Sequence, residues 1–142
     1  MGETLTTFTT LANGKVLFKC STRGLEEVKM DYHPPLGDDL GYTGLEMLLM
    51  SLSGCSATAI VPVLRKMNIT VKDFSVEASG QRKDTHPTIL ETITLKFNLI
   101  SPDAAIESFE RAVKLAEDTY CPVWAMLKGN TEISTVLNLI RE

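Results

Sequence analysis

The sequence predicts an α+β fold with its elements in the order β-β-β-α-β-β-α-α-β. Three observations predict it. Short segments of alternating apolar and polar residues occur in both halves of the chain, a long uncharged segment with a helix start signal lies between them, and two further helical segments precede the last strand. Because the 142 residues contain no repeat or linker, we expect one domain over residues 1–142.

The first third of the chain has the composition of three strands. Residues 3–11 are rich in Thr, Leu and Phe, which favours a strand. Asn13-Gly14 is a strong signal for the turn of a hairpin. Alternation of apolar and polar residues over 15–20 and 28–32 predicts the second and third strands.

The central segment predicts a long helix. Thr43 and Glu46 form a capping-box pattern ahead of an apolar run, and we expect the helix to extend to about Asn68. From Met47 to Leu64 the run has 18 residues without a charge. This length is sufficient for a transmembrane span.

Three interpretations of the uncharged helix compete: a membrane span, a helix buried on all sides in one chain, and a helix between its own sheet and a second copy. Polar and helix-weakening residues argue against the span, and we expect no membrane association; they are Ser51, Ser53, Gly54, Ser56, Thr58 and Pro62. We favour a homodimer with this helix near its centre. Small residues would allow close helix approach: Ser51, Gly54, Ala57 and Ala59.

The second half alternates strands with helices. Apolar residues recur at every second position over 74–80 and 93–99, with a polar turn at 81–87 between them, which predicts a hairpin. Ser101-Pro102 has the pattern of an N-cap and first turn of a helix.

A shorter helix is predicted close to the C-terminus. Pro122 is suited to a first helical position, and Gly129 is suited to end the helix. Residues 131–140 then form the last strand.

Composition excludes several functions. With 18 acidic and 14 basic residues the net charge is −4, which argues against a nucleic-acid partner. Two histidines and three cysteines without a C-x-x-C pair do not make a standard metal site, and we expect no metal or bound cofactor. The odd number of cysteines favours a reducing cytoplasm over a secreted disulfide framework.

The three cysteines have different surroundings. Cys20 alternates with strand residues and is best interpreted as a core residue. Cys55 lies three turns into the uncharged helix, where it is either a packed small residue or a thiol activated by a cation from elsewhere. Cys121 precedes a helix start, where free N–H groups favour a thiolate, although a silent cap residue is an equal alternative.

An ordered set of short motifs resembles the OsmC/Ohr family of osmotically inducible and organic-hydroperoxide-resistance proteins. The set covers about residues 40–128. It comprises residues 45–55 (LEMLLMSLSGC), 64–67 (LRKM), Arg82, His86-Pro87, 111–113 (RAV) and 120–123 (YCPV).

The resemblance implies a thiol peroxidase that works as an intertwined homodimer, with two central helices and antiparallel sheets around them. By this analogy Cys55 resembles the peroxidatic cysteine and Cys121 the resolving one. Peroxide would oxidise Cys55 to a sulfenic acid, Cys121 would close a disulfide, and a dithiol, often lipoyl in the family, would reduce it.

The chain resembles a divergent branch of the family. Characterised members carry a Glu ten positions before the cysteine, and here that position is Leu45. Glu46 lies nearly opposite Cys55 on a regular helix, and the capping box explains it. Arg23 is the only arginine of the N-terminal strands, and His86 is interpreted as part of a hairpin connection. A ligand-binding or redox-sensing dimer with little turnover is therefore the alternative function.

Overall fold

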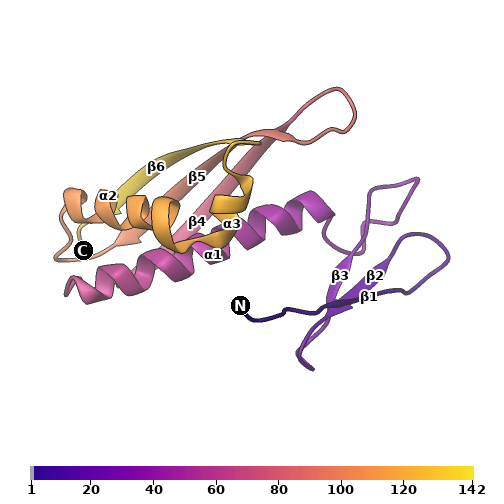
Figure 1. The fold of residues 1–142 in the computed structure, drawn as a ribbon, viewed down its shortest axis with the longest axis horizontal. Coiled ribbons are helices and arrows are strands. Elements are labelled where there is room, and N and C mark those ends of the chain that lie inside the picture. The colour runs from indigo at the N-terminus through magenta and orange to yellow at the C-terminus, as the bar shows by residue number, and fades with distance from the viewer. Residues whose placement is uncertain (1) are drawn as a thin grey trace. The chain divides into compact units, whose positions relative to one another are not determined.

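The computed structural model describes residues 2–142 and divides into two compact units, Met1–Met47 and Leu48–Glu142. The predicted α+β class and order of elements are confirmed, with one added helical turn before the last helix (Figure 1). Each unit contains a three-stranded sheet of its own.

The first unit contains the antiparallel sheet β1 (Phe8–Leu11), β2 (Phe18–Ser21) and β3 (Val28–Met30), in that order. All three strands are shorter than the sequence predicts, because ladder pairing involves only part of each predicted segment. The predicted hairpin at Asn13 is confirmed, since its Oδ1 accepts the backbone N–H groups of Lys15 at 2.9 Å and Leu17 at 3.1 Å.

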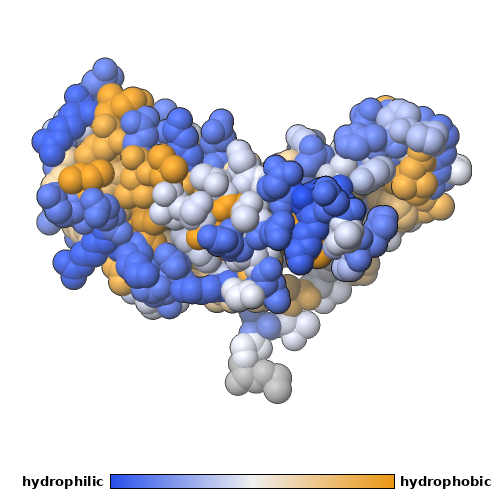
Figure 2. Space-filling view, turned by 90° about the horizontal axis from the view of Figure 1, so that it is seen from above, coloured by the Kyte–Doolittle hydropathy of each residue, from blue (hydrophilic) through white to orange (hydrophobic). Residues whose placement is uncertain are grey.

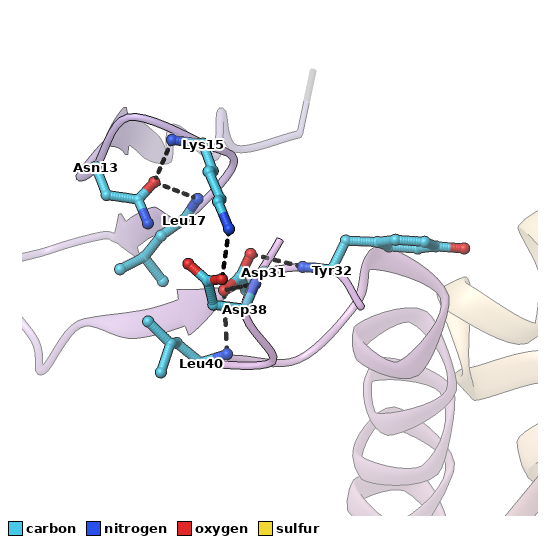
Figure 3. A network of polar contacts seen from close by, with 7 residues as sticks. All are labelled: Asn13, Lys15, Leu17, Asp31, Tyr32, Asp38 and Leu40. Atoms are coloured by element: carbon cyan, nitrogen blue, oxygen red, sulfur yellow. Dashed lines mark hydrogen bonds and ion pairs between the residues drawn. The ribbon is translucent and has the colours of Figure 1, made fainter. Parts of the chain in front are cut away.

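A buried carboxylate organises the loop after β3 (Figure 3). Asp31 Oδ1 accepts the N–H of Tyr32 at 2.7 Å, and Oδ2 accepts those of Leu40 at 3.0 Å and Asp38 at 3.2 Å. Burial raises the pKa of Asp31, but these amides outweigh it, so that the pKa lies below its ordinary value. Lys15 Nζ pairs with Asp38 Oδ1 at 2.7 Å and ties the hairpin to the same loop.

Apolar side chains remain exposed in the first unit. Phe8 is 64% exposed, Leu11 54% and Leu25 56%. Hydrophobic residues are visible at the surface among hydrophilic ones in Figure 2. A sheet of this size buries little apolar area by itself, so its stability depends on further packing.

The long helix α1 (Gly44–Lys66) begins at the predicted capping box. Thr43 N–H donates to Glu46 Oε1 at 2.8 Å, and Glu46 N–H donates to Thr43 Oγ1 at 3.2 Å. Its fully buried residues recur every four positions and form one stripe: Leu52, Ser56, Ile60 and Leu64. By length and composition alone, α1 is apolar and long enough to cross a membrane.

The sheet of the second unit consists of β4 (Asp73–Arg82), β5 (Leu90–Ile100) and β6 (Glu132–Ile140) in that order. β4 and β5 form the predicted antiparallel hairpin. β6 pairs with β5 in parallel, so the expectation of a wholly antiparallel sheet is wrong for this strand. The inward residues of β5 are buried, namely Ile93, Leu95, Phe97 and Leu99, while the alternate residues are polar. Helices therefore cover only one face of this sheet (Figure 1).

The connection from β5 to β6 contains α2 (Ile106–Leu115), the π-helical turn η1 (Ala116–Tyr120) and α3 (Pro122–Leu127). The predicted helix start at Ser101-Pro102 is wrong, because α2 begins at Ile106. Ser101 Oγ instead accepts the N–H groups of Asp103 and Ala104 and stabilises a separate turn. The π-helical turn was not expected from the sequence.

Aromatic rings join the layers of the second unit. Phe97 on β5 stacks with Trp124 on α3, with ring centroids 6.4 Å apart. Phe74 on β4 contacts Phe97 at 6.2 Å and Phe109 on α2 at 6.4 Å. These contacts anchor α3 against the sheet, and Cys121, which precedes α3, is held in place with it.

Candidate thiol site

Cys55 lies on the flank of the buried stripe of α1. It follows the buried Leu52 by three positions and precedes the buried Ser56 by one, so its side chain is half-buried. Successive residues are separated by ~100° around a helix, which places Cys55 beside the core and not within it. Its thiol is free.

Cys121 is the N-cap of α3 and is held on both sides. Its N–H donates to the Ala116 carbonyl at 2.9 Å, and its carbonyl accepts from Ala125 at 3.1 Å. Its Sγ accepts the N–H of Trp124 at 3.4 Å. The predicted start of a short helix at Cys121-Pro122 is confirmed, and Gly129 follows the helix with φ +96°.

The two thiols lie close enough to interact. Burial raises the pKa of Cys121 to about 11, and a hydrogen bond and charge interaction with Cys55 add to this rise. The N–H of Trp124 lowers the pKa but is outweighed. The expectation that the helix start favours a Cys121 thiolate is therefore wrong, because Cys121 is only 2% exposed. Cys121 is a protonated thiol at neutral pH.

A cavity of about 700 Å³ lies beside Cys55. One wall is a continuous strip of α1 and the residue after it, with the lining positions 54, 55, 58, 59, 62, 63, 66 and 67. Leu115, Tyr120 and Pro122 line the opposite side, immediately around Cys121. The lining is mainly apolar, and it is open to solvent because Thr58, Pro62 and Tyr120 are exposed.

Charged side chains stabilise the π-helical turn before Cys121. Lys128 Nζ lies 3.2 Å from Glu117 Oε2 and 3.5 Å from Asp118 Oδ1, and Lys114 Nζ lies 3.5 Å from the same Asp118 atom. The hydrogen bond that Lys128 Nζ donates to the Glu117 carboxylate raises the pKa of Lys128. Lys128 follows α3, so this cluster connects the segments on both sides of Cys121. Single π-helical turns often occur at functional sites.

The other residues that the sequence analysis considered lie in turns, a helix cap and a strand. Cys20 lies on β2, where it is half-buried and accepts a hydrogen bond from Thr9 Oγ1 at 3.7 Å, so the expected full burial is wrong. Glu46 is engaged in the capping box, and Arg23 lies in an exposed turn with φ 54°. His86 belongs to the β4–β5 connection, as expected.

Sequence reasoning did not find the cavity. Its α1 residues recur at intervals of three and four from Cys55, which is the spacing of one helix face and the signal that would have identified them. Among residues 2–142, no group of three His, Cys, Asp or Glu side chains is placed to hold a metal ion.

Comparison with known proteins places the chain in a family. The family model described as "OsmC-like protein" matches residues 37–136. The chain belongs to the OsmC-like family. It is 33% identical to Protein YhfA of Escherichia coli K12 over 90 residues, which are 63% of this chain and 67% of YhfA.

Solved structures share the complete fold. A hypothetical protein from Aquifex aeolicus is 28% identical, with a TM-score of 0.85 and 97% of each chain covered. An organic hydroperoxide resistance protein from Elizabethkingia anophelis is 20% identical, with a TM-score of 0.71 and 98% of each chain covered. This second likeness shows a common fold.

Proposed function

We propose that this protein is a thiol-dependent peroxidase that reduces organic hydroperoxides through Cys55 and Cys121. The observation that carries the proposal is the interaction between the two thiols beside an apolar cavity. The shared fold with proteins named for organic hydroperoxide resistance supports the same chemistry. An apolar wall suits an organic peroxide better than hydrogen peroxide.

The reaction proceeds in three balanced steps. The Cys55 thiolate attacks the terminal oxygen of the hydroperoxide, which breaks the O–O bond and gives a sulfenic acid and an alkoxide that takes a proton to become the alcohol. The Cys121 thiol condenses with the sulfenic acid, forming the S–S bond and releasing water. A dithiol of the lipoyl type then exchanges with the disulfide and is itself oxidised.

The pKa of Cys121 fits the role of the second thiol. A peroxidatic cysteine must be a thiolate, and a pKa of about 11 keeps Cys121 protonated. Cys55 is therefore the nucleophile, and Cys121 brings the proton that leaves with the sulfenic oxygen as water. No metal or bound organic cofactor enters these steps.

We propose that the working form is a homodimer with α1 near its centre. Gly54 lies on the outward side of α1, and an added Cβ would meet no atom within 4 Å. Met50 on the same helix is 44% exposed, and the first unit exposes Phe8 and Leu11. Exposed apolar side chains of this kind favour a second copy as partner. Sedimentation equilibrium at twice the mass of the chain would support this assembly, and the single mass would contradict it.

A reducing cytoplasm fits this cycle. All three cysteines are free thiols, and the resting enzyme requires Cys55 and Cys121 to be reduced. Neither the acidic net charge nor the apolar cavity favours a nucleic-acid partner.

One observation favours a second function, a redox-sensing or ligand-binding dimer with little turnover. Glu46 is used in the capping box with Thr43 and is not free to activate a thiol. Titration of Cys55 separates the two functions. A thiolate pKa near or above the free value of ~8.5 favours the sensor, and a value well below neutrality favours the peroxidase.

The proposed function is tested by adding one equivalent of an organic hydroperoxide and mapping disulfides by mass spectrometry. We expect a Cys55–Cys121 bond in the wild type. Cys55→Ser abolishes turnover, whereas Cys121→Ser leaves a Cys55 sulfenic acid that a dimedone probe captures. Cys20→Ser is the matched control and retains turnover. Hydroperoxide consumption by Cys55→Ser at the wild-type rate would overturn the assignment.

A further inference from the structure

Cys121 takes its position from the two helical segments beside it. Its N–H donates to the carbonyl of Ala116, the first residue of η1, at 2.9 Å. Its carbonyl accepts from Ala125 and its Sγ accepts from Trp124, both in α3. The junction between η1 and α3 therefore sets the direction of the thiol. A change in the angle between these segments would move Sγ away from Cys55, with which it interacts.

An ion pair crosses this junction. Lys128 directly follows α3, and its Nζ lies 3.2 Å from Glu117 Oε2 and 3.5 Å from Asp118 Oδ1. Both carboxylates belong to η1. Glu117 and Lys128 are eleven positions apart in the sequence, and Cys121 lies between them. The ion pair therefore closes a loop around Cys121 and connects the C-terminal end of α3 to the π-helical turn.

A second lysine of the same cluster does not cross the junction. Lys114 lies in α2, and its Nζ is 3.5 Å from Asp118 Oδ1 and 3.9 Å from Glu117 Oε1. Lys114 and both carboxylates precede Cys121 in the sequence. The side chain of Lys114 is 65% exposed and that of Lys128 is 53% exposed. The chain thus contains two lysines with the same partners and similar exposure, of which one spans Cys121.

The exposure of the cluster limits the size of its effect. An ion pair at the surface changes an equilibrium by about two- to fivefold. The side chain of Glu117 is 26% exposed, so solvent screens it less than it screens the lysines. An effect of this size does not decide whether the domain folds. It is sufficient to change how often two neighbouring thiols meet.

We propose that Lys128 is a positioning residue for the second step of the cycle, which acts by holding Cys121 against Cys55. This inference rests on the proposed function and adds a residue to it. In this step the two sulfur atoms bond, the S–O bond of the sulfenic acid breaks, and the oxygen leaves as water with its own proton and that of Cys121. The competing reaction uses a second hydroperoxide, which oxidises the sulfenic acid to a sulfinic acid and leaves as the alcohol.

The first experiment separates the two steps through Trp124, the single tryptophan of the sequence, whose N–H contacts Cys121 Sγ. Its fluorescence is recorded after rapid mixing with excess cumene hydroperoxide. A phase whose rate rises with peroxide concentration reports oxidation of Cys55, and a phase independent of that concentration reports disulfide closure. We expect Lys128→Met to slow closure by about two- to fivefold, as for one exposed ion pair, and to leave the oxidation rate unchanged.

Three further results are expected from this experiment. Lys128→Met accumulates more sulfinic acid at Cys55, which mass spectrometry measures. Lys128→Arg keeps the ion pair and most of the closure rate. Lys114→Met is the matched control and closes at the wild-type rate, because it removes a charge from the same cluster without releasing the junction. Urea unfolding shows that all of these variants are folded under the assay conditions.

A thiol–disulfide equilibrium provides a readout that needs no peroxide. The protein is equilibrated with mixtures of reduced and oxidised dithiothreitol, and the Cys55–Cys121 disulfide is quantified by mass spectrometry. The two protein thiols are oxidised as the cyclic disulfide of the reagent is reduced. We expect Lys128→Met to lower the equilibrium constant for disulfide formation by a factor similar to that for closure, because two less restrained thiols lose more freedom when they bond. Lys114→Met keeps the wild-type constant.

The outcomes that contradict the proposal differ from those that contradict the proposed function. An unchanged closure rate and equilibrium constant in Lys128→Met, or an equal fall in Lys114→Met, would overturn the role of Lys128. Failure of the wild type to consume hydroperoxide would count against the proposed function, while the dithiothreitol equilibrium would still test Lys128. Absence of the disulfide from the oxidised wild type would overturn both.

Discussion

Cys121 Sγ accepts the N–H of Trp124 at 3.4 Å, and yet its pKa is raised to about 11. A backbone N–H at the start of a helix stabilises an anion and lowers the pKa of a thiol that it contacts. Here burial of the thiol among apolar residues raises the pKa by more. The position of Cys121 at a helix start therefore fixes the direction of its side chain and does not activate it. This relationship keeps the Cys121 thiol protonated at neutral pH.

The first prediction concerns stability at alkaline pH. The pKa of Cys121 is raised in the folded protein, so the folded state holds the proton after the unfolded chain has lost it. Stability is complete below the unfolded pKa and declines as pH rises through the interval from 9.0 to about 11. The decline due to this group is on the order of 2 kcal/mol. Urea unfolding of the reduced protein on both sides of this interval measures it.

The control for that measurement is Cys121→Ser. Serine does not ionise in this range, and its hydroxyl accepts the Trp124 N–H as a good N-cap. We expect the alkaline decline to be shallower in the variant, while lysine and tyrosine titration affect both proteins equally. Identical slopes would mean that Cys121 is not the group responsible.

The second prediction concerns the close packing of Gly37. A Cβ at this position would clash with Asp31 Oδ1 and with the Tyr32 carbonyl oxygen. Gly37→Ala must therefore displace the carboxylate that organises the loop, and we expect a loss of about 1–3 kcal/mol in the free energy of unfolding. Gly14→Ala is the control, since nothing lies within 4 Å of its added Cβ. Equal stability of the two variants would show that the loop relaxes without cost.

Local signals in the sequence were sufficient for most of the fold. The reciprocal bonds of Thr43 and Glu46 were predictable because a capping box involves residues only three positions apart. The turn at Asn13 and the helix start at Pro122 are local in the same sense. Alternation along β5 also predicted which of its residues face the core.

Features that depend on tertiary contacts were not predictable. The parallel pairing of β6 with β5 depends on how the intervening helices return the chain. Ser101-Pro102 has the sequence pattern of an N-cap, yet the Ser101 hydroxyl stabilises a turn before α2. The pKa of Cys121 depends on burial by residues distant in sequence. Proximity of Cys55 and Cys121, 66 positions apart, was inferred only from the family resemblance.

The third prediction concerns acid stability of the first unit. The pKa of Asp31 is lowered in the folded protein, so its contribution is present above the ordinary value of 3.8 and is lost as pH falls through the folded pKa. Asp31→Asn removes this titration and weakens the bonds from Leu40 and Asp38. We expect the variant to be less stable at neutral pH and to lose less stability on acidification. A parallel pH profile for the two proteins, followed by circular dichroism in urea, would contradict the role of Asp31.

The fourth prediction separates structure from catalysis at Glu46. The hydrogen bonds with Thr43 lower the pKa of Glu46, first through the backbone N–H, so its stabilising effect is present above 4.5 and fades as pH falls through the folded pKa. Thr43→Ala removes the cap hydroxyl and should cost about 1 kcal/mol, while Thr43→Asn retains an acceptor and most of the stability. Glu46→Gln keeps an oxygen able to accept the Thr43 N–H and should cost less than Thr43→Ala. Because Glu46 serves the cap, hydroperoxide consumption by Glu46→Gln should equal that of the wild type. Its loss in a variant that unfolds at the wild-type urea concentration would instead assign Glu46 to activation of Cys55.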